Sequence, residues 1–380
     1  MTGSILMISG EASGDLHGAN LIKALKAAMP SLVVKGMGGK KMRAAGLEGL
    51  DSTPLAVVGI VEAVKKLPPI KKAFGYLKRL LKSERFDCVV LIDYPDFNLR
   101  FAALAKKSGV PVVYYISPQV WAWRKGRIGK IARLVDKMLV VLPFEAELYK
   151  DTGLDVEYVG HPLVDTVSCD MTKAEARGYL GLAEDSTVIA LLPGSRVEEV
   201  ELLLPPMAEA MGVVGAEPGF KFEVVLPVAD SIDDAQLERL LSASPLPVKL
   251  LHGRTYETLR ASDAAVVASG TATLEAALIK TPMVIVYKVS PVSALIIRTL
   301  IDIDLLGLPN IISGGKIVPE LIQEEVTPPN IARELLGILK DPERRRTMEE
   351  SLEAMRDKVD GHDAAGRAAM AVRKVMEGAP

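Results

Sequence analysis

The segment Leu191-Leu192-Pro193-Gly194-Ser195-Arg196 carries the clearest chemistry in this chain of 380 residues. An apolar run typical of a buried strand, Val188–Leu192, ends at Pro-Gly, and a helical pattern begins after Arg196. This order places backbone N–H groups, the Ser195 hydroxyl and the Arg196 guanidinium together at the start of a helix. Because the first N–H groups and the dipole of a helix favour negative charge, we predict a phosphate site here.

A second segment, residues 269–275, also follows a predicted strand and opens a helix. Gly270 and Thr271 are small enough to let a ligand approach the backbone, and Glu275 comes about one turn later. A carboxylate in that position can accept hydrogen bonds from ribose hydroxyls. The alternative is an ordinary capping box with Thr271 or Thr273 as the cap. Taken together with the first segment, a nucleotide site is the better interpretation.

Acidic side chains follow two strands predicted in the first half of the chain. Asp93 comes directly after the apolar run Asp87–Ile92, with Asp96 and Asn98 close behind, and Glu11 follows the first strand. Ligands of parallel sheets bind beyond the carboxyl ends of the strands, so a carboxylate there can act as the base for a hydroxyl group. The alternative is that Asp96 or Asn98 caps the next helix, and we favour that role for at least one of them. The spacing of the two aspartates does not indicate a metal site.

A loop that combines aromatic and basic residues follows another predicted strand. It holds the two tryptophans of the chain, Trp121 and Trp123, and then Arg124. Such loops suit sugar faces, phosphates and lipid headgroups. The alternative is that the tryptophans are core residues that anchor one helix.

The stretch Val57–Lys82 alternates apolar and basic residues at helical spacing and is interrupted at Pro68-Pro69. This pattern fits a pair of amphipathic helices at a membrane interface with anionic headgroups. The alternative is two helices whose apolar side faces the core and whose lysines are solvated. Both interpretations concern the same lysines, among them Lys65, Lys66, Lys71 and Lys72.

Composition limits the class of protein. Hydrophobic residues make up 49% and charged residues 25%, as in a globular protein with a large core, and the net charge of −2 argues against bulk nucleic-acid binding. Two distant cysteines and four histidines without ligand spacing predict neither a disulfide framework nor a metal site. No signal peptide and no apolar run of roughly 18 residues is recognised, so we expect a cytoplasmic chain that does not span a membrane.

Strand and helix patterns alternate along the whole chain. This alternation predicts an α/β fold with two mainly parallel, doubly wound sheets. We place one domain at residues 1–165, a second at 166–345 and a helical tail at 346–380. The predicted strands are Ser4–Ser9, Leu32–Met37, Asp87–Ile92, Pro111–Ile116 and Lys137–Leu142 in the first half, and Val188–Leu192, Phe222–Pro227, Val248–Leu251, Ala264–Ala268 and Met283–Tyr287 in the second.

Taken in order, these motifs resemble one family, the lipid-A-disaccharide synthases. The resemblance covers residues 4 to 340, and WAWR, GSR and GTATLE are its specific parts. The matching motifs are SGEASGD, DYPDFN, SPQVWAWR, LPFE, VGHPLVD, LLPGSRxxEV, ASDAAVVASGTATLEAAL and LPN.

The resemblance implies a glycosyltransferase B fold, in which two Rossmann-like domains face each other across a cleft. It implies an inverting transfer of diacylglucosamine from UDP-2,3-diacylglucosamine to 2,3-diacylglucosamine 1-phosphate, which gives a β-1,6 disaccharide 1-phosphate and UDP. The donor is a UDP-sugar, and no cofactor or metal is expected. It also implies a peripheral enzyme on the inner face of the cytoplasmic membrane. The tail would pack back on the N-terminal domain or be exchanged in a homodimer.

Residue roles follow from the same resemblance. Asp93 would be the base, with Glu11 orienting the acceptor or the base. Ser195, Arg196 and the helix dipole would stabilise the UDP diphosphate, and Gly270 and Thr271 would also bind the nucleotide. Glu275 would hold the ribose, and Asn310 would be a second nucleotide contact. The residues that would face the acylated substrates or the lipid are Asp96, Asn98, Trp121, Trp123, Arg124, Lys65, Lys66, Lys71 and Lys72.

Two other functions share parts of this pattern. An enzyme of the UDP-N-acetylglucosamine 2-epimerase type would have the same UDP site, but it needs an acid and a base around the sugar C2. A non-catalytic UDP-sugar-binding protein at a membrane would bind UDP without turnover.

Overall fold

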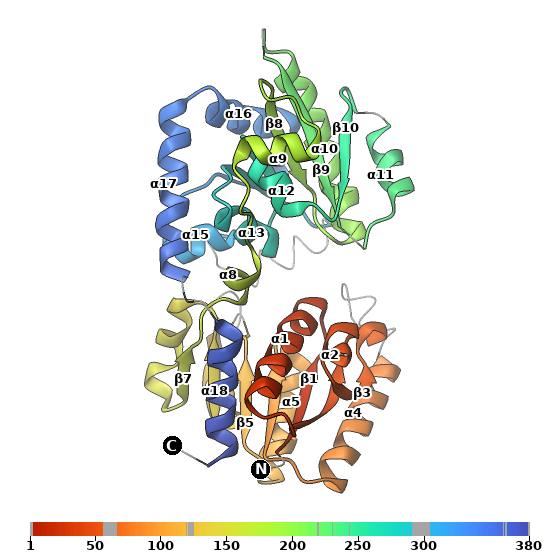
Figure 1. The fold of residues 1–380 in the computed structure, drawn as a ribbon, viewed down its shortest axis with the longest axis vertical. Coiled ribbons are helices and arrows are strands. Elements are labelled where there is room, and N and C mark those ends of the chain that lie inside the picture. Colours follow the sequence, from red (N-terminus) through yellow and green to blue (C-terminus); the bar gives the residue numbers. More distant parts are fainter. Residues whose placement is uncertain are drawn as a thin grey trace. The chain divides into compact units, whose positions relative to one another are not determined.

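The computed structural model describes residues 3–55, 67–118, 120, 125–218, 220–229, 231–242, 244–290, 305–359, 361 and 363–378. The chain forms two compact units (Figure 1). The N-terminal unit comprises residues 1–165 together with 361–380, and the C-terminal unit comprises residues 166–360. Trp121, Trp123, Arg124, Lys65 and Lys66 lie outside the described residues.

The N-terminal unit is built on a parallel sheet that has seven strands in its described part, in the order β3-β2-β1-β4-β5-β6-β7. The central strands are fully buried because helices cover both faces of the sheet. Its strands are β1 (Ser4–Ser9), β2 (Val33–Gly38), β3 (Leu47–Asp51), β4 (Cys88–Ile92), β5 (Val112–Tyr115), β6 (Lys137–Val140) and β7 (Asp155–Tyr158).

Side chains that alternate along each strand reach opposite layers of helices. Leu6, Val89 and Leu91 pack in one core cluster with side chains of α4 and α5. The helix α18 contacts α1 as well as β4 and β5 (Figure 1). The helical elements are α1 (Ala12–Ala28), α2 (Lys40–Ala44), η1 (Thr53–Leu55), α4 (Leu67–Ser83), α5 (Pro95–Lys107), η2 (Lys125–Arg127), α7 (Ile128–Leu134), η3 (Pro143–Thr152), α8 (Pro162–Thr166) and α18 (Ala364–Met376).

The C-terminal unit repeats this plan with a parallel sheet of six described strands, in the order β10-β9-β8-β11-β12-β13. Its strands are β8 (Thr187–Leu192), β9 (Phe222–Val228), β10 (Val248–His252), β11 (Ala264–Ala268), β12 (Met283–Tyr287) and β13 (Glu320–Ile322). Its helical elements are α9 (Lys173–Leu180), α10 (Val197–Gly215), α11 (Asp234–Leu241), α12 (Thr255–Ala261), α13 (Thr271–Leu278), α15 (Leu308–Ser313), η4 (Gln323–Glu325), α16 (Pro328–Leu339) and α17 (Pro342–Val359).

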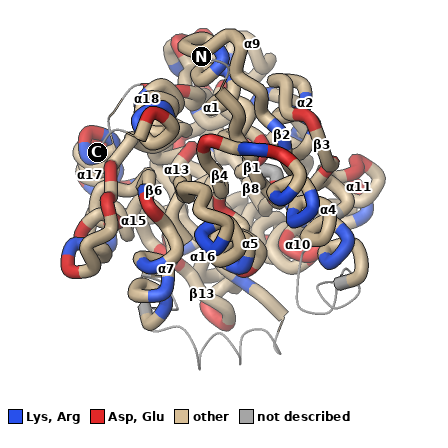
Figure 2. Tube along the Cα trace, turned by 90° about the horizontal axis from the view of Figure 1, so that it is seen from below, with Lys and Arg blue, Asp and Glu red and all other residues tan. Residues whose placement is uncertain are grey.

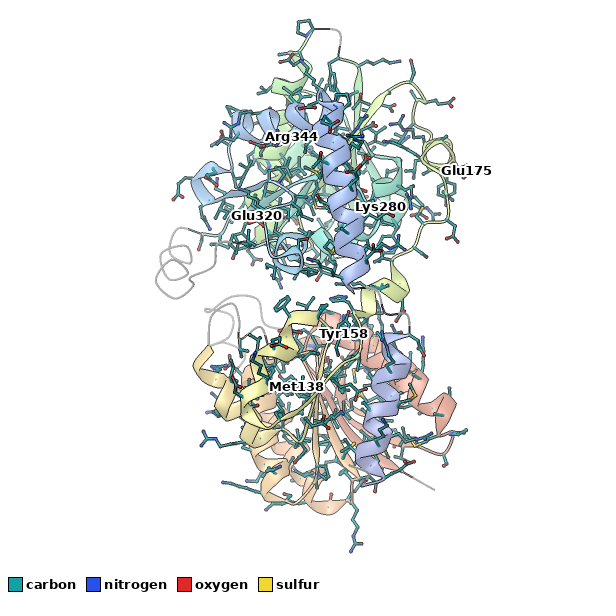
Figure 3. The ribbon with its side chains drawn as sticks, turned by 90° about the vertical axis from the view of Figure 1, so that its left-hand side faces the viewer. Met138, Tyr158, Glu175, Lys280, Glu320 and Arg344 are labelled. Carbon is teal, nitrogen blue, oxygen red and sulfur yellow. The ribbon has the colours of Figure 1, made fainter. Side chains whose placement is uncertain are left out.

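The segment that we expected to form one tail, residues 346–380, is divided between the two units. Met348, Leu352 and Met355 of α17 are buried in the C-terminal unit, and Lys280 pairs with Glu353 at 3.0 Å on its surface (Figure 3). In contrast, α18 belongs to the N-terminal unit of its own chain. Its start is held there because the carboxylate of Asp165 accepts hydrogen bonds from the backbone N–H groups of Asp363 and Ala364. Exchange of this helix between two chains stays a prediction.

Three strands, β3, β7 and β13, are absent from the sequence prediction. Each lies at the edge of its sheet, where one side of the strand has no neighbouring strand in the described part of the chain. The residues of β3 and β7 are accordingly mostly half-buried or exposed, and β13 has only three residues. The continuous apolar run that identifies a central strand is therefore missing, and the pattern does not distinguish them from loops.

A buried arginine joins α9 to the sheet of the C-terminal unit. The Arg177 guanidinium donates to the carbonyl oxygens of Ala261 and Glu184 and pairs with Asp263 at 2.6 Å. Asp263 also accepts the backbone N–H of Val188 at 2.7 Å. Removing Arg177 would leave two carbonyl oxygens without their donor and would leave Asp263 with Lys173 and the Val188 N–H as partners. This loss is costlier than that of an exposed pair.

We therefore expect Arg177→Ala to lower the free energy of unfolding of the C-terminal unit by about 3 kcal/mol. The matched control is Arg346→Ala in the same unit. Arg346 pairs with Glu343 on the exposed side of α17, and its loss should leave the unfolding curve nearly unchanged. Chemical denaturation followed by circular dichroism measures both variants. Equal effects of the two substitutions would contradict the role given to Arg177.

Candidate active site

The carboxyl ends of β1 and β4 bring Glu11 and Asp93 together in the N-terminal unit. The two strands are parallel neighbours, with Ser9 beside Ile92. Asp93 and Tyr94 both adopt left-handed backbone conformations, with φ of 46° and 48°. Two such residues in succession are rare outside glycine and mark a strained turn of the kind that gathers at functional sites.

Hydrogen bonds to the Asp93 carbonyl oxygen hold this turn. It accepts the Tyr114 hydroxyl at 2.6 Å and the Asn98 side-chain amide at 2.7 Å. The Asp93 backbone N–H donates to the carbonyl oxygen of Tyr115. The backbone of Asp93 is thereby fixed from three directions, so the direction of its side chain is largely set by the fold.

The environment of Asp93 favours its neutral form. Burial raises the pKa of this carboxyl to about 6, and the negative charge of Glu11 acts in the same direction. A hydrogen bond from the backbone of Tyr94 opposes the shift. A carboxylate with a pKa close to neutrality can both accept a proton and release it, as a general base must. Asp93 and Glu11 thus lie where the sequence analysis expected an acidic site.

Asn98 does not face a ligand, contrary to the prediction. Its side chain is fully buried beneath the turn, and its amide donates to the carbonyl oxygens of Ile92 and Asp93. Asp96 is exposed and pairs with Arg127 at 2.9 Å. The expectation that one of them caps α5 is also wrong, because the N-cap position is Tyr94 and both residues lie inside the helix.

The helix α4 uses its apolar face inside the N-terminal unit. Ala73, Leu77 and Leu81 are buried in the core cluster, as in the alternative that we left open for this stretch. Lys71 and Lys72 are exposed. The basic face of α4, defined by Lys71, Lys72, Lys78, Arg79 and Lys82, is turned to solvent (Figure 2).

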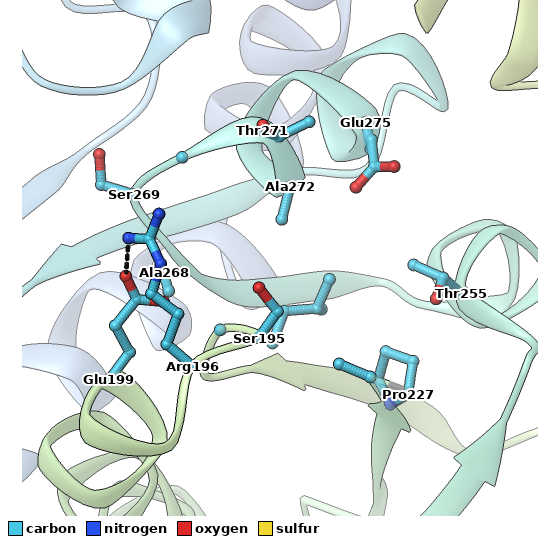
Figure 4. Close-up of a pocket in the computed structure, with 14 residues that line it drawn as sticks. Ser195, Arg196, Glu199, Pro227, Thr255, Ala268, Ser269, Thr271, Ala272 and Glu275 are labelled. Atoms are coloured by element: carbon cyan, nitrogen blue, oxygen red, sulfur yellow. Dashed lines mark hydrogen bonds and ion pairs between the residues drawn. The ribbon is translucent and has the colours of Figure 1, made fainter. Parts of the chain in front are cut away.

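A cavity of about 290 Å³ lies at the carboxyl ends of β8 and β11 in the C-terminal unit (Figure 4). This position follows the rule that ligands bind at the strand ends of parallel sheets. All the residues that the sequence analysis assigned to a nucleotide except Asn310 come together here, although they come from two segments that are distant in the chain. The lining includes Ser195, Arg196, Gly270, Thr271 and Glu275.

Two helices begin at this cavity. Gly194 and Gly270 have φ of 117° and 151°, conformations that side chains other than glycine rarely adopt, and each lies just before a helix. The N-cap residues are Arg196 in α10 and Gly270 in α13, and neither offers a side-chain cap bond. The capping-box alternative with Thr271 or Thr273 as the cap is therefore wrong; the Thr273 hydroxyl and backbone N–H instead donate to the carbonyl oxygen of Gly270. The first N–H groups of α10, and those of Thr271 and Ala272 in α13, can face an anion.

Glu275 has a partner that the sequence analysis missed. The Tyr256 hydroxyl donates to Glu275 Oε1 at 3.1 Å. Burial raises the pKa of Glu275, and the hydrogen bond from Tyr256 opposes that rise. Tyr256 comes from α12 and carries no local motif, so only the tertiary structure could identify it.

Asn310 lies apart from the cavity. It is fully buried, its amide nitrogen donates to Val318 and Glu320, and its oxygen accepts the N–H groups of Ile317 and Val318. All four hydrogen bonds of the Asn310 side-chain amide are thus made within the protein. Its effect on the site is indirect.

The indirect connection runs through Glu320. The Glu320 carboxylate also accepts the backbone N–H groups of Leu306 and Gly307, at 2.9 and 2.8 Å. The carbonyl oxygen of Leu306 accepts the hydroxyl of Ser269, which lines the cavity. Asn310 and Glu320 thus hold the backbone at Leu306, to which the Ser269 hydroxyl is hydrogen-bonded.

The described residues contain no group of three or more His, Cys, Asp or Glu side chains that could hold a metal ion. Among those residues there is also no helix that is long and apolar enough to cross a membrane.

Solved structures with the same fold include glycosyltransferases and epimerases. MurG from Acinetobacter baumannii is 14% identical, with a TM-score of 0.60 over 98% of this chain and 99% of that one. The UDP-GlcNAc 2-epimerase from Neisseria meningitidis, solved with UDP-GlcNAc, is 13% identical, with a TM-score of 0.67 over 98% and 100%. The prediction of a glycosyltransferase B fold with two parallel-sheet α/β domains is confirmed.

Sequence relatives separate these possibilities. The lipid-A-disaccharide synthases of Syntrophus aciditrophicus and Trichlorobacter lovleyi are 47% and 44% identical to this chain, over 96% and 98% of its length and 96% and 97% of theirs. A family model described as lipid-A-disaccharide synthetase matches residues 5–375. This protein therefore belongs to the lipid-A-disaccharide synthetase family and is a glycosyltransferase.

Proposed function

We propose that this glycosyltransferase of lipid A synthesis joins UDP-2,3-diacylglucosamine and 2,3-diacylglucosamine 1-phosphate with inversion at the anomeric carbon. The 6-hydroxyl oxygen of the acceptor attacks the anomeric carbon of the donor while the bond from that carbon to the UDP oxygen breaks. The hydroxyl proton passes to a base, and UDP leaves with the bonding electron pair. The products are the β-1,6 disaccharide 1-phosphate and UDP.

The observation that carries this proposal is the state of Asp93. Its carboxyl is buried at a strand end, its backbone is fixed by three hydrogen bonds, and its pKa is raised to about 6. At neutral pH the Asp93 carboxyl is ionised in most molecules and can accept a proton from a hydroxyl. We assign Asp93 as the base and Glu11 as the charge that tunes it.

The leaving diphosphate is assigned to the cavity of the C-terminal unit. Arg196 and the open starts of α10 and α13 would neutralise its charge as it develops. Glu275, oriented by Tyr256, would accept hydrogen bonds from the ribose. In this assignment the UDP-sugar is the only nucleotide required, and neither a further cofactor nor a metal takes part.

We expect the wild-type protein to convert the two acylated substrates to the disaccharide 1-phosphate and UDP, which mass spectrometry of the products detects. Asp93→Asn should abolish turnover, because an amide cannot take the proton, yet it should bind UDP with wild-type affinity in calorimetry. Turnover that survives Asp93→Asn would exclude Asp93 as the base. Formation of the 2-epimer from UDP-N-acetylglucosamine would instead support the epimerase alternative.

The pH dependence of kcat/KM tests how Glu11 acts. Because Asp93 must be ionised to work as a base, kcat/KM should fall as the pH drops through about 6. Glu11→Gln removes the negative charge that helps to raise the pKa of Asp93, so the acidic limb should move to lower pH. Asp96→Asn is the matched control, since Asp96 is exposed and pairs with Arg127. A limb at the same pH in wild type and Glu11→Gln would argue against this coupling.

We also propose that the basic face of α4 docks the enzyme on an anionic phospholipid surface at the inner face of the cytoplasmic membrane. The acyl chains of both substrates require access to a lipid surface. The apolar face of α4 is buried, so attraction by this helix would rest on charge, at about 1 kcal/mol for each cation near the surface.

Replacing Lys71, Lys72, Lys78 and Lys82 with Gln should strongly reduce binding to vesicles of phosphatidylglycerol and phosphatidylethanolamine. The loss should be largest at low salt, because salt screens the attraction. The control removes the same charge elsewhere, by replacing the exposed Lys23, Lys107, Lys150 and Lys374 with Gln. Vesicle flotation measures both proteins. Similar binding of the two variants would show that the position of the lysines on α4 has no importance.

A further inference from the structure

The cavity of the C-terminal unit already holds a negative charge beside Arg196. Glu199 lines the same cavity, and its Oε1 pairs with Arg196 Nη1 at 2.8 Å (Figure 4). Arg196, the predicted phosphate ligand, is therefore already paired with a carboxylate of the protein itself.

The second oxygen of this carboxylate lies against the Gly194 turn. A Cβ atom placed on Gly194 would stand 2.7 Å from Glu199 Oε2. The carboxylate thus lies between the Gly194 turn and the guanidinium, close to the open start of α10. An incoming phosphate needs the same guanidinium and the same helix start.

We propose that Glu199 competes with the nucleotide diphosphate for Arg196 and must give up this ion pair when the diphosphate binds. The inference rests on the proposed function, because it takes the cavity as the UDP site. In the free protein Glu199 balances the charge of Arg196 and holds the guanidinium at the cavity. In the complex its charge opposes the diphosphate, which weakens the retention of UDP and favours its release as a product.

The solvent exposure of the Glu199–Arg196 pair favours a pair that opens when the diphosphate binds over one that stays closed. The Arg196 side chain is 57% exposed and the Glu199 side chain 31%, so water screens the pair and little is lost when it opens. A supporting carboxylate would instead be held from several sides, as Glu320 is by three donors. The two roles predict changes of opposite sign when the charge of Glu199 is removed.

The chain offers a matched control in the preceding residue. Glu198 is also acidic and lies in the same first turn of α10, so it has the same relation to the helix dipole. It is exposed and does not line the cavity. Glu198→Gln therefore removes the same charge from the same helix turn without touching Arg196.

The experiment compares the binding of UDP and of uridine to wild type, Glu199→Gln and Glu198→Gln by titration calorimetry. We expect Glu199→Gln to bind UDP about three- to tenfold more tightly, with the gain shrinking in high salt. Uridine has no phosphate, so its affinity should be the same for all three proteins. Glu198→Gln should bind UDP like wild type.

Unchanged or weaker UDP binding by Glu199→Gln would overturn the inference and give Glu199 a supporting role. An equal gain in Glu198→Gln would overturn it as well, because the effect would then be one of general charge. Both results leave the proposed function intact. Failure of the wild-type protein to bind UDP would instead remove the nucleotide site itself, and the inference with it.

Discussion

The N-terminal unit depends on one strained and half-buried turn, at Asp93 and Tyr94. Two consecutive residues in left-handed conformations cost on the order of 1–3 kcal/mol each. The turn persists because Tyr114, Asn98 and Tyr115 bind the backbone of Asp93 from a rigid sheet and helix. The strain and the buried carboxyl thus coincide at one residue, as expected where function rather than stability selects the geometry.

The buried carboxyl has its own effect on stability. Since the pKa of Asp93 is raised from 3.8 to about 6, the folded state binds its proton more tightly than the unfolded state does. The contribution of Asp93 to stability is therefore favourable below about pH 4 and declines as the pH rises to about 6. At neutral pH the ionised group costs the fold about 3 kcal/mol. The extensive core on both faces of the sheet offsets this loss.

The two candidate sites use different physics. The acidic site of the N-terminal unit relies on burial, which changes the proton affinity of one carboxyl. The cavity of the C-terminal unit relies on exposed helix starts and an exposed arginine that is paired with Glu199. Each unit has a buried asparagine near its candidate site, Asn98 in the N-terminal unit and Asn310 in the C-terminal unit. Each one forms hydrogen bonds with backbone groups at a sharp bend. The Asn98 amide donates to two backbone carbonyl oxygens, whereas the Asn310 amide both donates and accepts.

The sequence by itself determined the strands with continuous apolar runs, the position of Asp93 and Glu11 at strand ends, and the two glycine turns that open helices at the cavity of the C-terminal unit. Each of these follows from local pattern, because apolar runs, strand-end position and helix-start chemistry are all encoded in short segments. Only the tertiary structure showed that Asn98 and Asn310 point into the protein, that Tyr256 binds Glu275, and that the apolar face of α4 is already covered. Those facts depend on which residues distant in the chain become neighbours. Asparagine has the same chemistry whether it meets a ligand or a bent backbone, so its sequence context cannot distinguish the two.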